Sequence, residues 1–504
     1  MSIDGQQSSQ QGKLQRRLTH DSPASLDNGG GIDLPPVAVC SHLVTIYFDY
    51  VHDQLHTLFQ KPAFMADMSM NQISPAIMFG VVALSARFSS HEYFTGQSPR
   101  TRAVAYARQA AALFDPSVVS LTSIQTAVLL GACRIVEGDA YGESIYYGIG
   151  CRMAQLLDLP HRNCSTRLER EINIRVWYTL CMIDEWSSTG VGVPKQITSP
   201  PTDVALPCEE MAFLQLRSHD FSASASPWDE GMSTISSTSS LSSSSSLLAQ
   251  MILLNHILSD VNKLNKRSVD DRMLFPDDNA VHALSERLDA WEAELPPFMR
   301  DDRSNLAHYA GQGLGRIFVA VYLGYYHFGQ LLFYQYLHGA SDEMEGFTSD
   351  FPRRCKYHAA KLCNMVYAAL DTPGCDVLYN MVGHVLVVAS TVQIHTVLFS
   401  TDDDEIAAAR QRLERNYTIL LRLRDLWPSL DFCMMRLQAF HKACRSSMDT
   451  SFRLDKWMLT FLSEFAKPVD DKPTEADWAI GDIAITPRSD FGFNPTYFEE
   501  LMGP

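Results

Sequence analysis

Apolar residues recur at helical spacing through most of the chain. They stand at every fourth position from Leu43 to Leu55 and again from Ile145 to Leu157. This interval places the apolar side chains on one face of an α-helix. No run of alternating apolar and polar residues is long enough to build a sheet. The pattern predicts an all-α fold, a large bundle of packed helical hairpins in two halves.

Three segments depart from the helical pattern. Residues 1–38 are rich in Gln, Ser, Gly and Asp, with few apolar residues, so we expect them to be disordered. Residues 222–246 contain a serine run that cannot bury apolar area, which predicts a flexible loop inside a helical domain of residues 39–466. Residues 467–504 form a C-terminal tail in which acidic residues alternate with aromatic and aliphatic ones.

The tripeptide Glu137-Gly138-Asp139 predicts a tight turn between two helices. One helical pattern ends near Val136 and the next begins near Ala140. Gly138 can adopt the left-handed conformation that ends a helix, and the Asp139 side chain can cap the following helix. We therefore expect a helical hairpin at this point.

The overall charge of the chain argues against broad contact with nucleic acid. The formal net charge is −17, whereas neutralising phosphates requires clustered Lys and Arg, so direct DNA contact is not expected. The 46% hydrophobic content of 504 residues is enough for a sizeable core. The cysteines form no Cys-x-x-Cys pair, which fits free and mostly buried thiols.

The sequence shows no sign of membrane association. The first residues lack the apolar core of a secretory signal. The most apolar stretch, residues 377–399, is interrupted by Asn380, His384, Gln393 and His395. It therefore predicts a buried helix rather than a membrane span.

Motifs that would indicate an enzyme or a metal site are weak. Asp402 to Glu405 resemble the aspartate-rich segments that bind magnesium in all-α synthases, but no second acidic motif follows; carboxylates also favour the start of a helix. Cys355, His358 and Cys363 lack a fourth ligand at suitable spacing, so we interpret them as buried thiols beside a partly exposed histidine. Neither a Gly-x4-Gly-Lys loop nor a Gly-x-Ser-x-Gly elbow is present. We do not expect an enzyme.

Aromatic residues crowd residues 322–338. Aromatic side chains at helical spacing favour core packing, but a small-molecule pocket between helices would have the same lining. Both interpretations stay open at this point. The candidate effector pocket consists of Tyr322, Tyr326, His327, Phe333 and Tyr334.

The C-terminal tail also allows two interpretations. Acidic and aromatic residues alternate in disordered activation segments, where the acids keep apolar anchors solvated until a partner groove binds them. The candidate anchors are Trp478, Phe493 and Phe498. Alternatively, the tail docks its aromatic side chains on the helical body of the same chain.

Residues 139–197 carry three ordered features that resemble the centre of a known family. They are a Gly-x-Gly-x-Arg-Met-Ala helix at 148–154, an Arg-Val-Trp-Tyr helix at 175–178 leading to Asp184, and a Gly-Val-Pro loop at 192–194. They resemble the fungal-specific transcription factor domain, the middle homology region of zinc-cluster regulators. Leu43 to Phe64 is similar to the opening helix of that domain, followed by an extended Pro-x-Phe segment.

The resemblance implies a transcriptional regulator of metabolic genes, such as a secondary-metabolite cluster, located in the nucleus or shuttling to the cytoplasm. Family members normally carry a six-cysteine zinc cluster ahead of this domain, and the present sequence contains none, so no cofactor is expected. A homodimer, or a heterodimer with a zinc-cluster regulator, would then bring the chain to DNA. The resemblance also implies contact with the transcription machinery and a small-molecule effector.

Two alternatives come from other functional classes. One is an all-α metal-dependent enzyme of secondary metabolism that uses Asp402–Glu405, and the other is a cytoplasmic helical scaffold. Nuclear localisation would separate a regulator from a scaffold. Metal-dependent turnover would indicate the enzyme.

Overall fold

Each described part of the computed structural model contains helix. The structure describes residues 32–54, 56–198, 203–217, 245–270, 277–337, 350–446 and 451–472. These residues contain seventeen α-helices, no strand, and one isolated bridge between His52 and His56. The predicted all-α fold is confirmed, and all of the helices belong to the unit that begins at Leu34. The predictions for residues 1–31, for most of the serine run and for the tail beyond residue 472 lie outside the described residues.

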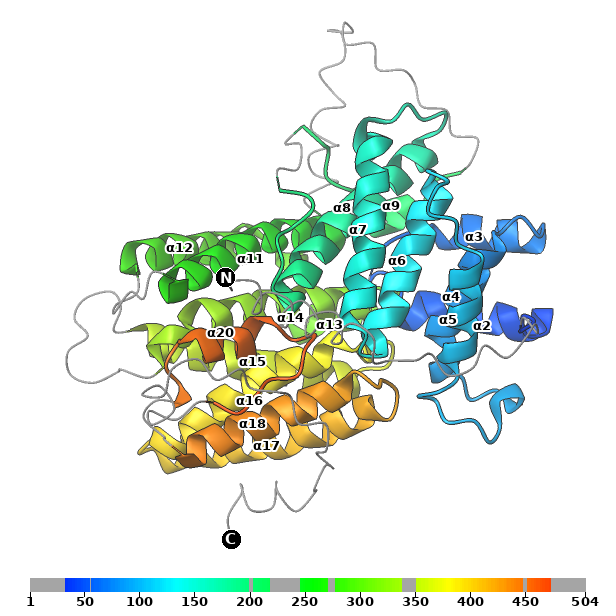
Figure 1. Cartoon of the computed structure of the whole chain (residues 1–504). Coiled ribbons are helices and arrows are strands. Elements are labelled where there is room, and N and C mark those ends of the chain that lie inside the picture. Colours follow the sequence, from blue (N-terminus) through cyan, green and yellow to red (C-terminus); the bar gives the residue numbers. More distant parts are fainter. Residues whose placement is uncertain are drawn as a thin grey trace, which may run out of the picture. The chain divides into compact units, whose positions relative to one another are not determined.

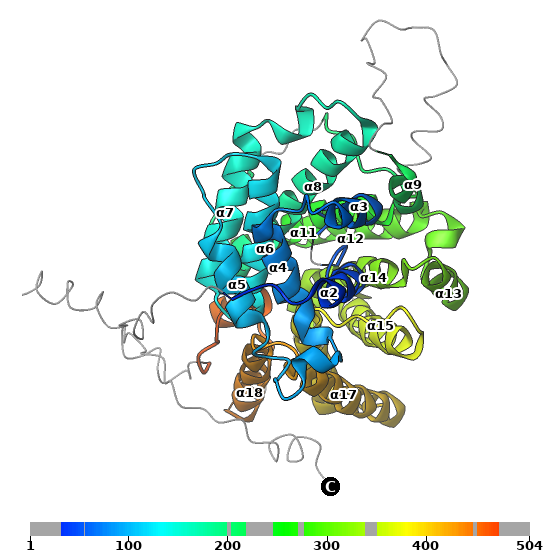
Figure 2. The ribbon, with the colours of Figure 1, turned by 90° about the vertical axis from the view of Figure 1, so that its right-hand side faces the viewer.

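The first half of the helical domain is built around two hairpins, α4–α5 and α6–α7. Its helices are α2 (Val37–Tyr50), α3 (Lys61–Ser69), α4 (Pro75–Ser85), α5 (Ala103–Ala112), α6 (Leu121–Val136), α7 (Ala140–Leu156), α8 (Arg167–Val191) and α9 (Glu210–Gln215). Figure 2 shows α4 between α2 on one side and α5 and α6 on the other, in agreement with the contacts of α4.

The turn between α6 and α7 has the predicted geometry. Gly138 has a φ of +86°, and the Asp139 carboxylate accepts a hydrogen bond of 2.8 Å from the backbone N–H of Gly142. The two helices approach closely beside Gly131, because a Cβ at this position would overlap the ring of Tyr147. The helical hairpin is therefore fixed both by its turn and by a small residue at the helix crossing.

The second half repeats the hairpin arrangement. Its helices are α11 (Leu247–Asp270), α12 (Asp278–Glu294), α13 (Arg303–Gly311), α14 (Gly315–Phe333), α15 (Phe351–Asp371), α16 (Met381–Phe399), α17 (Asp403–Arg424), α18 (Leu430–Ser446) and α20 (Lys456–Ser463). Helix α14 packs on α15, and α16 packs on α17 and α18. Figure 1 shows α15 to α18 stacked together, with α6, α7 and α8 side by side in the first half.

The two halves share one core. A single cluster of buried apolar side chains extends from Val39 to Ala466. Helix α11 joins the halves, because it packs on α8 of the first half and on α14 of the second. Trp177 and Trp291, which lie on apolar helical faces, are both buried in this cluster.

Two predictions near the N-terminus differ from the structure, one of a boundary and one of a local conformation. Helix α2 begins at Val37, before residue 39, because the carbonyl of Pro36 already accepts the first helical hydrogen bond. The segment around Pro62 is the first turn of α3 rather than an extended segment. Proline suits this turn because its missing N–H would have no partner in the helix. The side chain of Gln60 caps the same turn by accepting a hydrogen bond from Ala63.

Ser246 lies at the start of α11 and not in a flexible loop. Its side chain is fully buried, accepts a hydrogen bond from the N–H of Ala249 and donates one of 2.9 Å to Glu210. The Glu210 carboxylate also accepts the N–H groups of Leu247 and Leu248. The serine run therefore ends in a helix cap that ties α11 to α9.

Among the described residues, two helices are long and apolar enough to cross a membrane. They are Gly315–Tyr336, with 94% of its apolar window buried, and Met381–Phe399, with 83% buried. Since protein side chains cover both helices almost completely, their composition fits the centre of a helical core. This agrees with the buried helix predicted for residues 377–399.

Candidate functional site

A cavity of about 150 Å³ lies where the two halves meet. Its walls come from α7 and α8 of the first half and from α11, α14 and the start of α16 in the second, and these helices meet around α14 (Figure 1). Most of the wall is apolar. It includes Tyr147, Met182, Trp186, Leu254, Leu323 and Phe328. The cavity is thus bounded by elements that are far apart in the sequence.

Three amide side chains interrupt the apolar wall. Gln54, Asn255 and Asn380 are 8%, 8% and 6% exposed, and the side-chain oxygen of each has no hydrogen-bond partner. An unpaired buried acceptor costs on the order of 1–3 kcal/mol, so native proteins rarely retain several together. Their presence around one cavity marks it as a candidate binding site.

His327 on α14 also belongs to this wall. It is 1% exposed, and neither ring nitrogen has a hydrogen-bond partner. Burial lowers its pKa to about 3, so the imidazole is neutral at physiological pH. The ring stacks on Trp186 with centroids 5.9 Å apart, and it meets His384 edge-on at 5.3 Å.

Glu143 on α7 is the one carboxyl group among the described residues that line the cavity. It is 4% exposed and accepts a hydrogen bond of 2.9 Å from the Ser187 hydroxyl. Burial raises its pKa to about 8; the hydrogen bond from Ser187 opposes this rise, and the nearby negative charge of Asp139 contributes to it. The carboxyl group is therefore mostly protonated at neutral pH, and it can donate a hydrogen bond.

Of the predicted pocket residues, only His327 lines this cavity. The hydroxyls of Tyr322, Tyr326 and Tyr334 are engaged elsewhere, donating to Met299 O at 2.6 Å, Asp301 at 2.5 Å and Thr391 at 3.0 Å. Phe333 packs 5.1 Å from the ring of Phe351. These four side chains lie in the core contacts of α14.

The cavity uses a different set of positions on α14. Ala320, Gly324 and Phe328 recur at intervals of four, and His327 lies three residues after Gly324; all four line the cavity. The sequence signal that could have predicted this site is the pair of small residues Ala320 and Gly324, one helical turn apart and close to His327. The aromatic residues Tyr325, Tyr326 and Phe333 of the same helix instead pack against His358 of α15.

Phe465, just after α20, closes another part of the wall. Its ring centroid lies 4.9 Å from that of His384 and 6.0 Å from that of Trp186. The buried guanidinium of Arg436 holds this segment by donating to the carbonyls of Thr460, Glu464 and Lys467. The candidate anchors Trp478, Phe493 and Phe498, which follow further along, lie outside the described residues.

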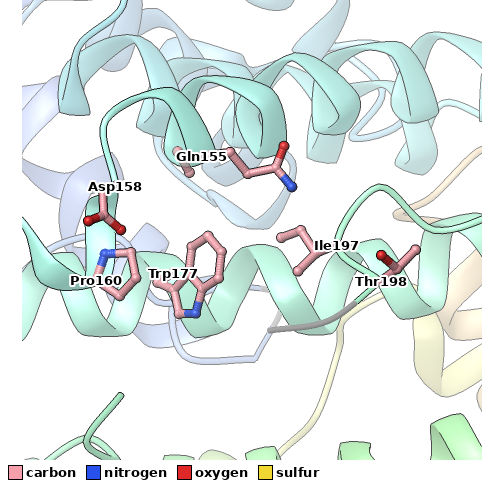
Figure 3. A pocket seen from close by; sticks show the side chains of 7 residues that line it. Gln155, Asp158, Pro160, Trp177, Ile197 and Thr198 are labelled. Carbon is pink, nitrogen blue, oxygen red and sulfur yellow. The ribbon is translucent and has the colours of Figure 1, made fainter. Parts of the chain in front are cut away.

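A second cavity of about 260 Å³ lies beside Trp177. Figure 3 shows Gln155 opposite Trp177, with Asp158 and Pro160 at one end and Ile197 and Thr198 at the other. The Asp158 side chain is 72% exposed, so this cavity reaches the surface. Its polar groups are exposed rather than buried and unpaired, apart from the indole nitrogen of Trp177.

The candidate metal sites do not assemble. The described residues contain no group of three or more His, Cys, Asp or Glu side chains that could hold a metal ion. All eleven cysteines are free, and burial raises the pKa of Cys363 to about 11. His358 is buried rather than partly exposed, since α14 packs over it at Gly329. These residues do not fit a six-cysteine zinc cluster.

Asp402 has a structural contact that explains the acidic cluster. Its carboxylate accepts hydrogen bonds from the N–H groups of Asp404 at 2.8 Å and Glu405 at 3.2 Å. This is the geometry of a helix N-cap. The cluster therefore stabilises the first turn of α17.

Comparison with known proteins identifies the family. A model of the fungal specific transcription factor domain matches residues 44–293, about half of the chain. A transcriptional regulatory protein of Schizosaccharomyces pombe is 24% identical over 58% of this chain and 32% of its own length. The Zn(2)-C6 fungal-type transcription factor FTF1a of Fusarium oxysporum f. sp. lycopersici is 21% identical over 80% of this chain and 39% of its own length.

A second regulatory protein of Schizosaccharomyces pombe is 24% identical over 58% of this chain and 46% of its own length. The chain thus spans less than half the length of each of these relatives. No solved structure matches it. The family model covers the helices that build one side of the cavity. The chain belongs to the fungal-specific transcription factor domain family.

Proposed function

We propose that the chain is a nuclear transcriptional regulator whose helical domain responds to a small molecule bound between its two halves. Membership of the family and the names of its relatives support the regulatory role. The observation that carries the sensing role is the cavity with buried, unpaired polar side chains in its wall.

The position of the cavity gives a physical route from binding to regulation. A ligand would touch α7 and α8 of the first half and α11 and α14 of the second at the same time. Filling 150 Å³ of space recovers about 3–4 kcal/mol, taking about 24 cal/mol per Å³. A ligand can shift a conformational equilibrium by as much as its affinities for the two states differ. Up to this energy would be available to favour the packing that encloses the ligand over one that does not.

We further propose that the regulated genes form a metabolic set and that the chain reaches DNA through a partner. The net charge of −17 supports recruitment by another protein over direct contact with phosphates. A second copy or a zinc-cluster regulator would be that partner. Contact with the transcription machinery would involve the tail.

The test of the regulatory role combines localisation with transcript analysis. A fluorescent fusion of the full chain should concentrate in the nucleus, and deletion of the gene should change the transcripts of a defined metabolic set. A fusion confined to the cytoplasm, together with unchanged transcripts, would favour the scaffold.

A cavity-filling variant tests the sensing role. Gly324 lines the cavity on α14, so Gly324→Leu places a branched side chain inside it. The matched control is Gly148→Leu on α7, where a Cβ meets no atom within 4 Å. We expect Gly324→Leu to fix the transcripts of the target genes at one level, while Gly148→Leu preserves the response. Equal responses of both variants and the wild type would refute the sensing role.

The role of the tail is tested by transfer. Residues 474–504 are fused to an unrelated DNA-binding domain, and an activation segment should then raise reporter output. Replacing Trp478, Phe493 and Phe498 by Ala should abolish the gain. If the tail docks on the helical body instead, the fusion should be silent, and removal of residues 474–504 should lower the stability of the protein. A gain that survives the triple replacement contradicts both roles.

A further inference from the structure

We infer that the cavity between the halves takes an uncharged molecule with a small apolar ring or chain that carries two or more hydroxyl groups. This inference rests on the proposed sensing role and names the chemical class of the effector. It follows from the size of the cavity, from its unpaired polar atoms and from the charge state of its wall.

The size limits the apolar part of the ligand. A cavity of about 150 Å³ lined by aliphatic and aromatic side chains can hold a benzene ring. The present cavity has about the same volume, and Trp186 and Phe328 offer flat surfaces to a ring. In the packing described here, the ligand is therefore of the size of one six-membered ring with its substituents.

Residues in the wall carry unpaired polar atoms, which we infer form hydrogen bonds with the ligand. Five unpaired buried atoms belong to residues that line this cavity, namely one oxygen each from Gln54, Asn255 and Asn380 and both ring nitrogens of His327. The amide oxygens are acceptors, so they need O–H or N–H donors.

A hydroxyl group matches both kinds of partner in the wall. It donates to an amide oxygen and at the same time accepts from the protonated carboxyl of Glu143 or from the N–H of His327. An ether offers acceptors only, which would leave the amide oxygens unpaired. A ligand with donors gains on the order of 1–3 kcal/mol for each acceptor that it pairs, so a ligand without donors should bind more weakly.

The charge state of the wall excludes an ionised ligand. Among the described residues that line the cavity there is no Lys, Arg or Asp, and burial keeps Glu143 and His327 in their neutral forms. An ion that enters a cavity with such a wall loses its hydration without gaining a counter-ion. The penalty amounts to several kcal/mol.

The test uses the full chain and three probes that share one ring. Resorcinol has two hydroxyl groups, 1,3-dimethoxybenzene has none, and 3-hydroxybenzoate carries a negative charge. Binding is measured by saturation-transfer NMR and titration calorimetry at pH 7. We expect resorcinol to bind at least about tenfold more tightly than either other probe, which corresponds to about 1.4 kcal/mol. Equal binding of all three, tighter binding of either comparison probe, or no binding of resorcinol would overturn the inference.

Two variants locate the binding in the cavity. Gly324→Leu should abolish the binding of resorcinol, and the control Gly148→Leu should keep it. Asn380→Leu removes an unpaired acceptor, so the folded state is not expected to suffer, and the preference for resorcinol over 1,3-dimethoxybenzene should fall at least threefold. An unchanged preference in Asn380→Leu would overturn the inference even if Gly324→Leu does not fold.

The outcome separates the ligand class from the proposed function. Selective binding of resorcinol with no transcriptional effect of Gly324→Leu would support the ligand class and contradict the sensing role. A transcriptional effect of that variant without selective binding would contradict the ligand class alone.

Discussion

Glu143 offers a sharp test of the electrostatics of the cavity, through its replacement by glutamine. The folded protein holds this carboxyl protonated because burial raises its pKa from 4.5 to about 8. In the unfolded chain the same group ionises near 4.5. Between these two values the folded state binds one proton more than the unfolded state, so rising pH destabilises the wild type. Glutamine keeps the shape and cannot ionise, and it therefore removes this pH dependence.

The magnitude follows from the size of the shift. Each pH unit between 4.5 and about 8 removes about 1.4 kcal/mol from the unfolding free energy of the wild type. Relative to the wild type, Glu143→Gln should therefore change little in stability at a pH near 4.5 and gain about 3 kcal/mol at pH 7. The stabilisation of Glu143→Gln relative to the wild type grows as the pH rises above 4.5 and stops growing near pH 8.

Urea unfolding followed by circular dichroism at several pH values between 5 and 8 measures this difference. Charges elsewhere in the protein affect variant and wild type equally, so only the difference between them is needed. The control is Glu171→Gln, since Glu171 accepts from Arg175 at 2.9 Å and from the N–H of Cys208 at 2.9 Å. The replacement removes the carboxylate that forms an ion pair with the buried guanidinium of Arg175, and it should destabilise by about 3–5 kcal/mol. If the difference in unfolding free energy between Glu143→Gln and the wild type did not depend on pH, or if the variant were destabilised like the control, the protonated state of Glu143 in the folded protein would be refuted.

Other replacements test the packing and the closing segment. Trp291→Ala should cost about 3–5 kcal/mol in urea unfolding, because a buried indole leaves a cavity; normal stability would indicate a binding surface instead. Gly131→Ala should destabilise by about 1–3 kcal/mol through overlap with Tyr147, whereas Gly148→Ala should stabilise by about 0.5–1 kcal/mol. Equal effects of the two alanines would contradict the close contact of α6 and α7. Arg436→Met should speed proteolysis after residue 456, and unchanged cleavage would show that the guanidinium does not hold this segment.

Features that depend on a few neighbouring residues could be predicted without the fold. Gly138 and Asp139 predicted the turn between α6 and α7. In the structure Gly138 has the left-handed conformation and Asp139 caps α7. Trp177 and Trp291 are buried, and each lies on the apolar face of a single helix. Such features are predictable because the interactions that fix them lie within one or two helical turns.

Local reasoning failed where a distant segment supplies the partner. Ser246 reads as the end of a serine run, yet Glu210 and the first turn of α11 make it a buried cap. His358 reads as partly exposed, but α14 covers it at Gly329. The distant partners, Glu210 for Ser246 and Gly329 for His358, lie outside any pattern within a few residues of either position.

The candidate site shows the same division most clearly. Tyr322 and His327 stand on one helix with similar surroundings in the sequence, but α14 turns the first toward Met299 and the second toward the cavity. Glu143 likewise reads as an ordinary acid in the first turn of α7, and it becomes neutral because burial among helices of both halves removes it from water, although the hydrogen bond from Ser187 favours the charged form. Helical spacing sets which side chains share a face. A cavity arises where side-chain volumes from helices distant in the sequence fail to fill the space between them, and that depends on the packing of all these helices together.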